Sequence, residues 1–211
     1  MPPHPKPPFV ESDQDGVNFE RVLFFSDAVF AIAITLLALE IRLPEVELDA
    51  LPQAILALLP EIAVYALSFL IVGLFWVGHH RNFQYIARYD YSLIWLNLLF
   101  LLCIAFLPVA SSILGHYYHH PFAVLFYCGV LCITSLMSVL LWWYASHNHR
   151  LIEADVEPHV IRYVFYRSVA TIAVALGAAG TAFINTTVAL VILGIGIVAQ
   201  LVRTLFSAVI R

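Results

Sequence analysis

Six long apolar segments constrain this chain more than any other feature of its sequence. They cover approximately residues 19–41, 58–78, 91–114, 121–144, 166–184 and 187–210. A helix needs about 20 mostly apolar residues to cross roughly 30 Å of hydrocarbon. A membrane β-barrel would instead show alternating segments of about 10 residues separated by turns. The pattern therefore predicts an all-α polytopic membrane protein with six transmembrane helices, which together form one domain over residues 19–211.

The composition excludes other classes of protein. Of the 211 residues, 62% are hydrophobic and 11% are charged, whereas a soluble domain is about 45–50% apolar and about 25% charged. A chain with so little polar surface is neither a water-soluble domain nor a disordered or nucleic-acid-binding one. We expect its surroundings to be a lipid bilayer, with no nucleic acid among its partners.

The basic residues predict the orientation of the six helices. Only Arg42 of the 10 lysines and arginines falls in the loops of one side, and the nine others fall on the opposite side: Lys6, Arg21, Arg81, Arg88, Arg150, Arg162, Arg167, Arg203 and Arg211. Cytoplasmic loops carry the excess of basic residues. The bias predicts a multi-pass protein of the cell (inner) membrane with both termini in the cytoplasm. Residues 1–18 have no apolar core, and we expect a disordered cytoplasmic tail there rather than a signal peptide.

Motifs of catalysis and metal binding are missing from the sequence. It contains no Gly-rich phosphate loop, no His-Glu-x-x-His and no Gly-x-Ser-x-Gly. Three histidines between the third and fourth segments could bind a metal, although a solvated loop is the commoner explanation; they are His116, His119 and His120. The thiols of Cys103, Cys128 and Cys132 fall inside predicted helices, where packing is their expected role. We expect no enzyme activity, no cofactor and no metal site.

The first apolar segment carries a buried carboxylate and an apolar stripe on different faces. At about 100° per residue, Ile32, Leu36 and Leu39 lie within about 60° of one another, and Asp27 points about 140° away from Ile32. A carboxylate inside a membrane costs about 2.5–3.5 kcal/mol unless it is hydrogen-bonded or hydrated. Asp27 should therefore face other helices. Periodicity alone leaves open whether the stripe does more than pack.

The candidate partners of the polar residues on this helix lie on the second and third segments. Ser26 precedes Asp27, His79 and His80 stand at the end of the second segment, and Asn97 lies in the third. We expect Ser26 and Asp27 to bond to His79, His80 or Asn97. A structural carboxylate and a functional one are both compatible with this placement.

Several motifs resemble those of the transmembrane protein 175 family of potassium channels. The first is Arg21-x-x-x-Phe25-Ser26-Asp27 on the first helix. Others are Trp76-x-x-His79-His80-x-x-Phe83, and Leu96-Asn97-Leu98 followed by Pro108. Animal members have two six-helix repeats, and this chain has one, as prokaryotic members do.

The resemblance implies a homotetrameric channel whose central pore is lined by the first helix. It implies potassium and other monovalent cations as permeant ions. By position after the motif, it assigns the hydrophobic constriction to Ile32, Leu36 and Leu39, and the selectivity-linked hydroxyl to Thr35. Arg21, Phe25, Ser26 and Asp27, with His79, His80 and Asn97, would support the pore helix.

The favoured function is a leak-like, potassium-permeable channel. The alternative is a proton-coupled secondary transporter that uses Asp27 as its protonation site, although the inverted repeats of most carriers are not found here. A membrane enzyme or scaffold is disfavoured by the missing motifs.

Overall fold

The computed structural model describes residues 15–41 and 45–209, and their side chains over 19–41 and 45–204. Within these ranges, six helices are long and apolar enough to cross a membrane, which confirms the prediction of six. They are α1 (Asp15–Leu39), α3 (Leu59–Phe83), α4 (Tyr91–His116), α5 (Pro121–Ser146), α6 (Pro158–Ala182) and α7 (Thr186–Val209). Three short helices complete the list: η1 (Leu48–Ala50), α2 (Leu51–Ala57) and η2 (His147–His149). Helices of this kind satisfy their own backbone polar groups, as the hydrocarbon core requires.

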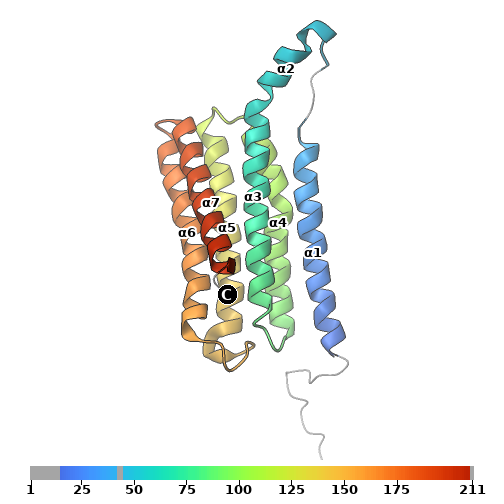
Figure 1. The fold of residues 1–211 in the computed structure, drawn as a ribbon, viewed down its shortest axis with the longest axis vertical. Coiled ribbons are helices and arrows are strands. Elements are labelled where there is room, and N and C mark those ends of the chain that lie inside the picture. Colours follow the sequence, from blue (N-terminus) through green and yellow to red (C-terminus); the bar gives the residue numbers. More distant parts are fainter. Residues whose placement is uncertain (1–14, 42–44, 210–211) are drawn as a thin grey trace, which may run out of the picture.

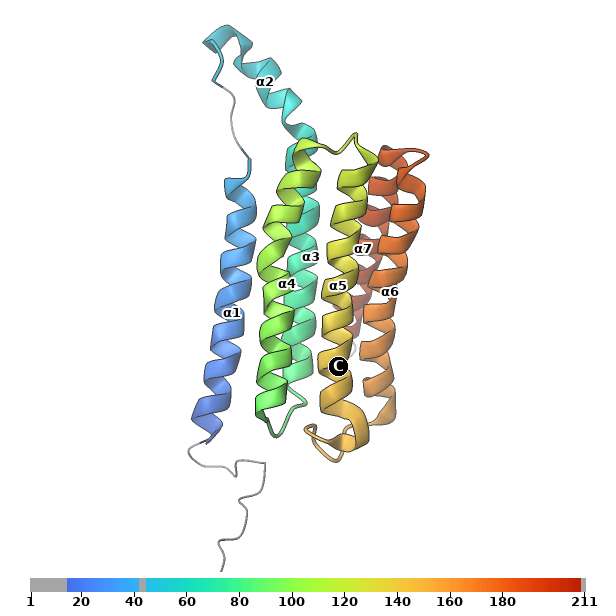
Figure 2. The same ribbon diagram turned by 180° about the vertical axis from the view of Figure 1, so that it is seen from behind.

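The long helices form an elongated bundle with α1 at one edge (Figures 1 and 2). α1 packs against α3 and α4, whereas α6 and α7 pack against α5 on the other side of the bundle. The loops after α3 and after α5 lie at the same end, near the start of α1; we call this the basic end, because Arg88 and Arg150 lie in these loops. The short helix α2 projects from the opposite end. This arrangement leaves one whole side of α1 outside the bundle.

The core of the bundle combines large apolar side chains with bonded hydroxyl groups. Trp142, Tyr127 and Phe30 are essentially inaccessible to solvent. The hydroxyl of Ser111 donates to Ser68 over 2.8 Å, and Ser68 is in turn bonded to the Tyr127 phenol over 2.8 Å. Buried polar groups in a membrane bundle are normally paired in this way.

Two helix boundaries at the N-terminal half differ from those expected. α1 begins at Asp15 rather than at Phe19, so only residues 1–14 of the expected tail remain, and they lie outside the described residues. α3 continues to Phe83 rather than ending at Gly78. An apolar run ends where polar residues begin. A helix can continue past that point, because its polar side chains can bond to partners or to water.

The segment between α5 and α6 is more ordered than the solvated linker that its charges suggested. Leu151 and Ile152 are buried. The carbonyl of Leu151 accepts hydrogen bonds from the backbone N–H groups of Ala87 and Arg88, and Ile86 and Ile152 form an isolated β-bridge. Two apolar residues within this charged segment therefore fix it to the loop after α3.

α6 begins at Pro158, eight positions before the expected start at Tyr166. A proline in the first turn is a common helix start, since its missing N–H has no intrahelical partner there. Arg162 consequently lies on α6 rather than in a loop. The predicted start followed hydropathy and overlooked this signal.

Candidate functional site

The candidate site is built on α1, whose two faces have different surroundings. Ser26, Phe30, Ala33 and Leu37 are at most 1% exposed and contact the bundle. The opposite face carries all the residues assigned to the constriction: Ile32 is 58% exposed, Leu36 41% and Leu39 71%. Thus the three residues that the sequence placed on one stripe do share one face, and that face points out of the bundle.

Thr35 lies on the same exposed face of α1. Its hydroxyl donates to the carbonyl oxygens of Ile32 and Ala31, which are 2.9 and 3.1 Å away. A hydroxyl has one proton and two lone pairs. Because the proton is used within the helix, the oxygen presents lone pairs outward.

A continuous chain of hydrogen bonds fixes the buried face of α1. The Asn97 amide nitrogen donates to Ser26 Oγ over 3.0 Å, and the Ser26 hydroxyl donates to the carbonyl of Val22 over 2.8 Å. Asn97 Oδ1 lies 2.8 Å from His79 Nε2, so this nitrogen carries the proton in a chain in which every group is satisfied. The helices α1, α3 and α4 thereby meet at Asn97.

The His79 ring is enclosed by phenylalanines. Its centroid lies 4.1 Å from that of Phe83 and 5.6 Å from those of Phe100 and Phe30, and its plane is parallel to Phe100 within 3°. His79 as a whole is 5% exposed. Through these contacts the His79 side chain touches residues of α1, α3 and α4.

Asp27 has a partner that the sequence analysis did not name. Its Oδ1 accepts a hydrogen bond of 2.8 Å from Trp76 Nε1 on α3. The expectation that Asp27 bonds to His79, His80 or Asn97 is not met. Trp76 belongs to the motif quoted from the second segment, and an indole N–H can only donate. The sequence does not reveal how α1 and α3 are shifted along each other, and it is this register that places Trp76 opposite Asp27.

Three other motif residues, Arg21, Phe25 and His80, point away from the bundle. Arg21 and Phe25 lie on the exposed side of α1. His80 is exposed at the end of α3, where its Nε2 lies 3.2 Å from the Gln84 amide nitrogen and its ring lies beside Trp76. The structure therefore brings together Ser26, His79 and Asn97, with Phe83 stacked on His79, and places Arg21, Phe25 and His80 outside this group.

The loop histidines show no metal-binding arrangement. Among the residues that the structure describes, no three His, Cys, Asp or Glu side chains are grouped so that they could hold a metal ion. His120 instead accepts from the backbone N–H of Phe122 at the start of α5, and His116 contacts the carbonyl of Ser112. Both act as local helix-end partners. The three cysteines are free.

Removing the Trp76 indole N–H tests the importance of the Asp27 contact. For Trp76→Phe we expect a loss of about 1–2 kcal/mol in the free energy of unfolding, because a hydrogen bond to a carboxylate contributes about 1.5–3 kcal/mol and partial exposure reduces this. Trp95→Phe is the matched control, since Trp95 is 66% exposed on α4. Thermal unfolding of both variants in detergent gives the comparison. Equal losses would show that the Asp27 contact is unimportant.

Comparison with known proteins gives consistent matches in sequence. A family model described as endosomal/lysosomal potassium channel TMEM175 matches residues 21–108. A potassium channel of Streptomyces collinus is 38% identical over 147 residues, which cover 67% of this chain and 71% of that one. The human endosomal/lysosomal proton channel TMEM175 is 31% identical over 154 residues, or 71% of this chain and 30% of the human protein.

The fold agrees with these matches. A crystal structure of a lysosomal potassium-selective channel TMEM175 homolog from Chamaesiphon minutus superposes with a TM-score of 0.79 at 28% identity, covering 89% of this chain and 98% of that one. Sequence and fold relate this chain to ion channels and not to enzymes. This multi-pass membrane protein therefore belongs to the TMEM175 family of potassium channels.

Proposed function

We propose that four copies of this chain form a leak-like, potassium-permeable cation channel with α1 of each copy lining a central pore. The observation that carries the proposal is the outward face of α1, where Ile32, Leu36 and Leu39 are all exposed. Six helices are too few to enclose a wide pore within one chain, and a closed ring of identical subunits is the usual way to build one. We take potassium to be the permeant ion because the similar prokaryotic proteins are potassium channels.

The composition of this face suits contact between helices better than contact with lipid. Small residues alternate there with large ones: Ala28, Ala31, Thr35 and Ala38 are exposed alongside Ile32 and Leu36. Small residues allow helix backbones to approach closely in membranes. Neighbouring α1 helices can thus pack through the small residues while the large ones point to a common axis.

The three large side chains then form the constriction. Ile32 and Leu39 are seven positions apart, which corresponds to about 10 Å along a helix. Apolar rings of this depth exclude water and ions when they are narrow and conduct when slightly wider. In this proposal gating requires only a small change in the tilt of α1.

The contacts of α1 with α3 and α4 control that tilt. Ser26 is held by Asn97, and Asp27 by Trp76, on the side of the helix away from the constriction. These contacts connect α1 to α3 and α4 without entering the pore. The motif residues Ser26, Asp27, His79 and Asn97 therefore support the pore helix in this proposal, and Arg21, Phe25 and His80 lie near its basic end.

The orientation follows from the same geometry. The loops after α3 and after α5 lie at one end with the start of α1 (Figure 2), so the basic residues of these loops share one side of the membrane. By the positive-inside tendency, this end faces the cytoplasm, and both termini lie there.

Ion flux into liposomes tests the proposed function. Purified protein is reconstituted, and potassium flux is followed with and without a proton gradient. A channel should conduct potassium down its gradient when no proton gradient is applied. Flux strictly coupled to protons would instead support the transporter alternative, with Asp27 as its protonation site.

Replacing Thr35 with valine tests its role in selectivity. Valine has the same shape but no oxygen, so four lone-pair donors leave the pore. We expect the potassium-to-sodium permeability ratio to fall about threefold to tenfold, because one hydroxyl contact contributes roughly 1 kcal/mol. Reversal potentials under bi-ionic conditions measure the ratio. Thr181→Val is a matched control, since Thr181 also bonds to its own helix but lies on α6.

A further inference from the structure

Arg167 is a charged residue inside a membrane-spanning helix, and it has no acidic partner among the side chains that the structure describes. It lies nine positions after the start of α6, or about 13 Å along the helix. Within the side chains described, residues 19–41 and 45–204, its polar contact is with the neutral Asn82, whose Oδ1 is 3.4 Å from Arg167 Nη2. The ion pairs of these ranges, Arg150–Asp90 and His159–Glu157, do not include it. A charge placed in a span without compensation points to a functional site.

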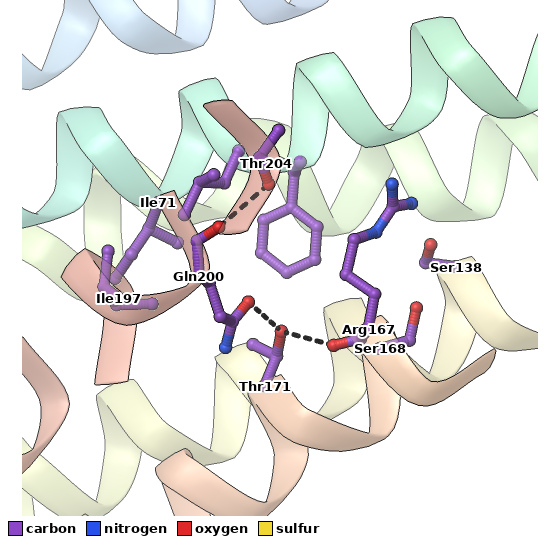
Figure 3. A pocket seen from close by; sticks show the side chains of 10 residues that line it. Ile71, Ser138, Arg167, Ser168, Thr171, Ile197, Gln200 and Thr204 are labelled. Carbon is purple, nitrogen blue, oxygen red and sulfur yellow. Dashed lines mark hydrogen bonds between the residues drawn. The ribbon is translucent and has the colours of Figure 1, made fainter. Parts of the chain in front are cut away.

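The guanidinium group lies at a defined place between α6 and α3. Side chains on a helix lean toward its N-terminus, which for α6 is the basic end. Figure 3 shows the Arg167 side chain extending away from the Thr171–Gln200 pair. It reaches instead to α3 at Gly78 and Asn82.

Gly78 makes this position possible. A methyl group on Gly78 would lie 2.6 Å from Arg167 Nη2 and 2.8 Å from Cζ. Any larger residue would therefore displace the guanidinium. Gly78 thus leaves room on α3 for the Arg167 guanidinium.

The guanidinium lines a cavity at this end of the bundle. The cavity has a volume of about 170 Å³ and its polar lining comprises Arg81, Asn82, Tyr85, His159, Tyr163 and Arg167. None of its lining residues is an aspartate or glutamate. Outside the lining, the carboxylate of Glu157 is bonded to His159 over 2.7 Å. Two arginines therefore face a cavity whose lining carries no negative charge.

We propose that this cavity binds a phosphate group, from an anionic lipid headgroup or from a soluble phosphate. An arginine fork matches two phosphate oxygens, and charge-assisted hydrogen bonds of this type are strong. The Tyr163 phenol and the Asn82 amide supply further hydrogen-bond donors. Basic pockets between transmembrane helices at a cytoplasmic surface bind lipid headgroups in this way. The bound group joins α3 to α6 and supplies the charge that Arg167 lacks.

The test measures thermal unfolding of the purified protein in detergent, which is independent of ion conduction. Phosphatidylglycerol, phosphatidylcholine and inorganic phosphate are titrated separately. We expect phosphatidylglycerol to raise the unfolding midpoint, and we expect Arg167→Gln to raise the half-saturating concentration about tenfold or more, because a hydrogen bond to a charged group is lost. Arg162→Gln is the matched control, since Arg162 is exposed on the same helix; it should have much less effect.

The outcomes separate the two sources of phosphate. Stabilisation by phosphatidylglycerol that depends on Arg167 supports a lipid headgroup, and the same dependence with inorganic phosphate alone supports a soluble ligand. If Arg167→Gln does not fold, Arg167→Lys, which keeps the charge but loses the fork, replaces it with the same expected direction. The proposal is overturned if neither phosphatidylglycerol nor inorganic phosphate stabilises the unmodified protein. It is also overturned if the Arg167 and Arg162 substitutions change the half-saturating concentration equally.

Discussion

Replacing Ile32 with asparagine is expected to raise the potassium conductance of the channel about tenfold or more. In the proposed tetramer the substitution places four amides where four apolar side chains now exclude water. A barrier that falls by about 1.4 kcal/mol passes ten times as many ions, and a polar ring hydrates a narrow pore. Because Ile32 is 58% exposed in the single chain, the substitution leaves the bundle core intact. Single-channel recording in a planar bilayer measures the change directly.

Ile133→Asn provides the control for this result. Ile133 is 55% exposed, similar to Ile32, but lies on α5. The same polar substitution there should leave the conductance unchanged. If the Ile32 variant folds and conducts like the unmodified protein, Ile32 does not lie at the constriction.

The second large effect concerns stability rather than conduction. Replacing Asn97 with leucine is expected to lower the free energy of unfolding by about 2–3 kcal/mol, because the buried Nε2–H of His79 loses its acceptor and Ser26 loses a donor. Both groups are at most 5% exposed, so water cannot replace the lost contacts. Thermal or denaturant unfolding in detergent measures the loss.

A double-mutant cycle shows whether the hydrogen bond itself is responsible. His79→Phe is expected to destabilise alone, because it leaves Asn97 without its partner, although a phenyl ring suits the contacts with Phe83 and Phe100. The double variant, with Asn97→Leu, removes both partners and should lose clearly less than the sum of the two single losses. Strict additivity would mean that the two residues act independently.

The number of membrane helices could be predicted from the sequence because hydropathy responds to the lipid environment itself. The six predicted spans correspond to α1 and α3–α7. Their ends were less predictable, since a helix can continue beyond the hydrocarbon. At α3 the buried His79 extends the helix through its bond to Asn97, and at α6 the start is set by Pro158. Histidine and proline both have low hydropathy values, so neither residue extends an apolar run in the sequence.

The faces of α1 were predictable because they depend only on helix geometry. Angular spacing placed Ile32, Leu36 and Leu39 together, and all three lie on the exposed face. The same geometry placed Asp27 on another face, but it could not identify Trp76 as its partner. That contact depends on how far α1 and α3 are shifted along each other, which no local pattern records. The buried Leu151 and Ile152 were missed for a similar reason: a short apolar pair among charges becomes significant only when another loop covers it.

The most direct test of the account is a cysteine scan of α1 probed with silver ions during potassium current recording. The native Cys103, Cys128 and Cys132 are first replaced by alanine. Cysteines at Ile32, Leu36 and Leu39 should make the current sensitive to irreversible block by silver, because these positions face the permeating ions in the proposed tetramer. Cysteines at the buried Phe30, Ala33 and Leu37 should not. Block at the buried positions but not at the exposed ones would contradict the assignment of this face of α1 to the pore.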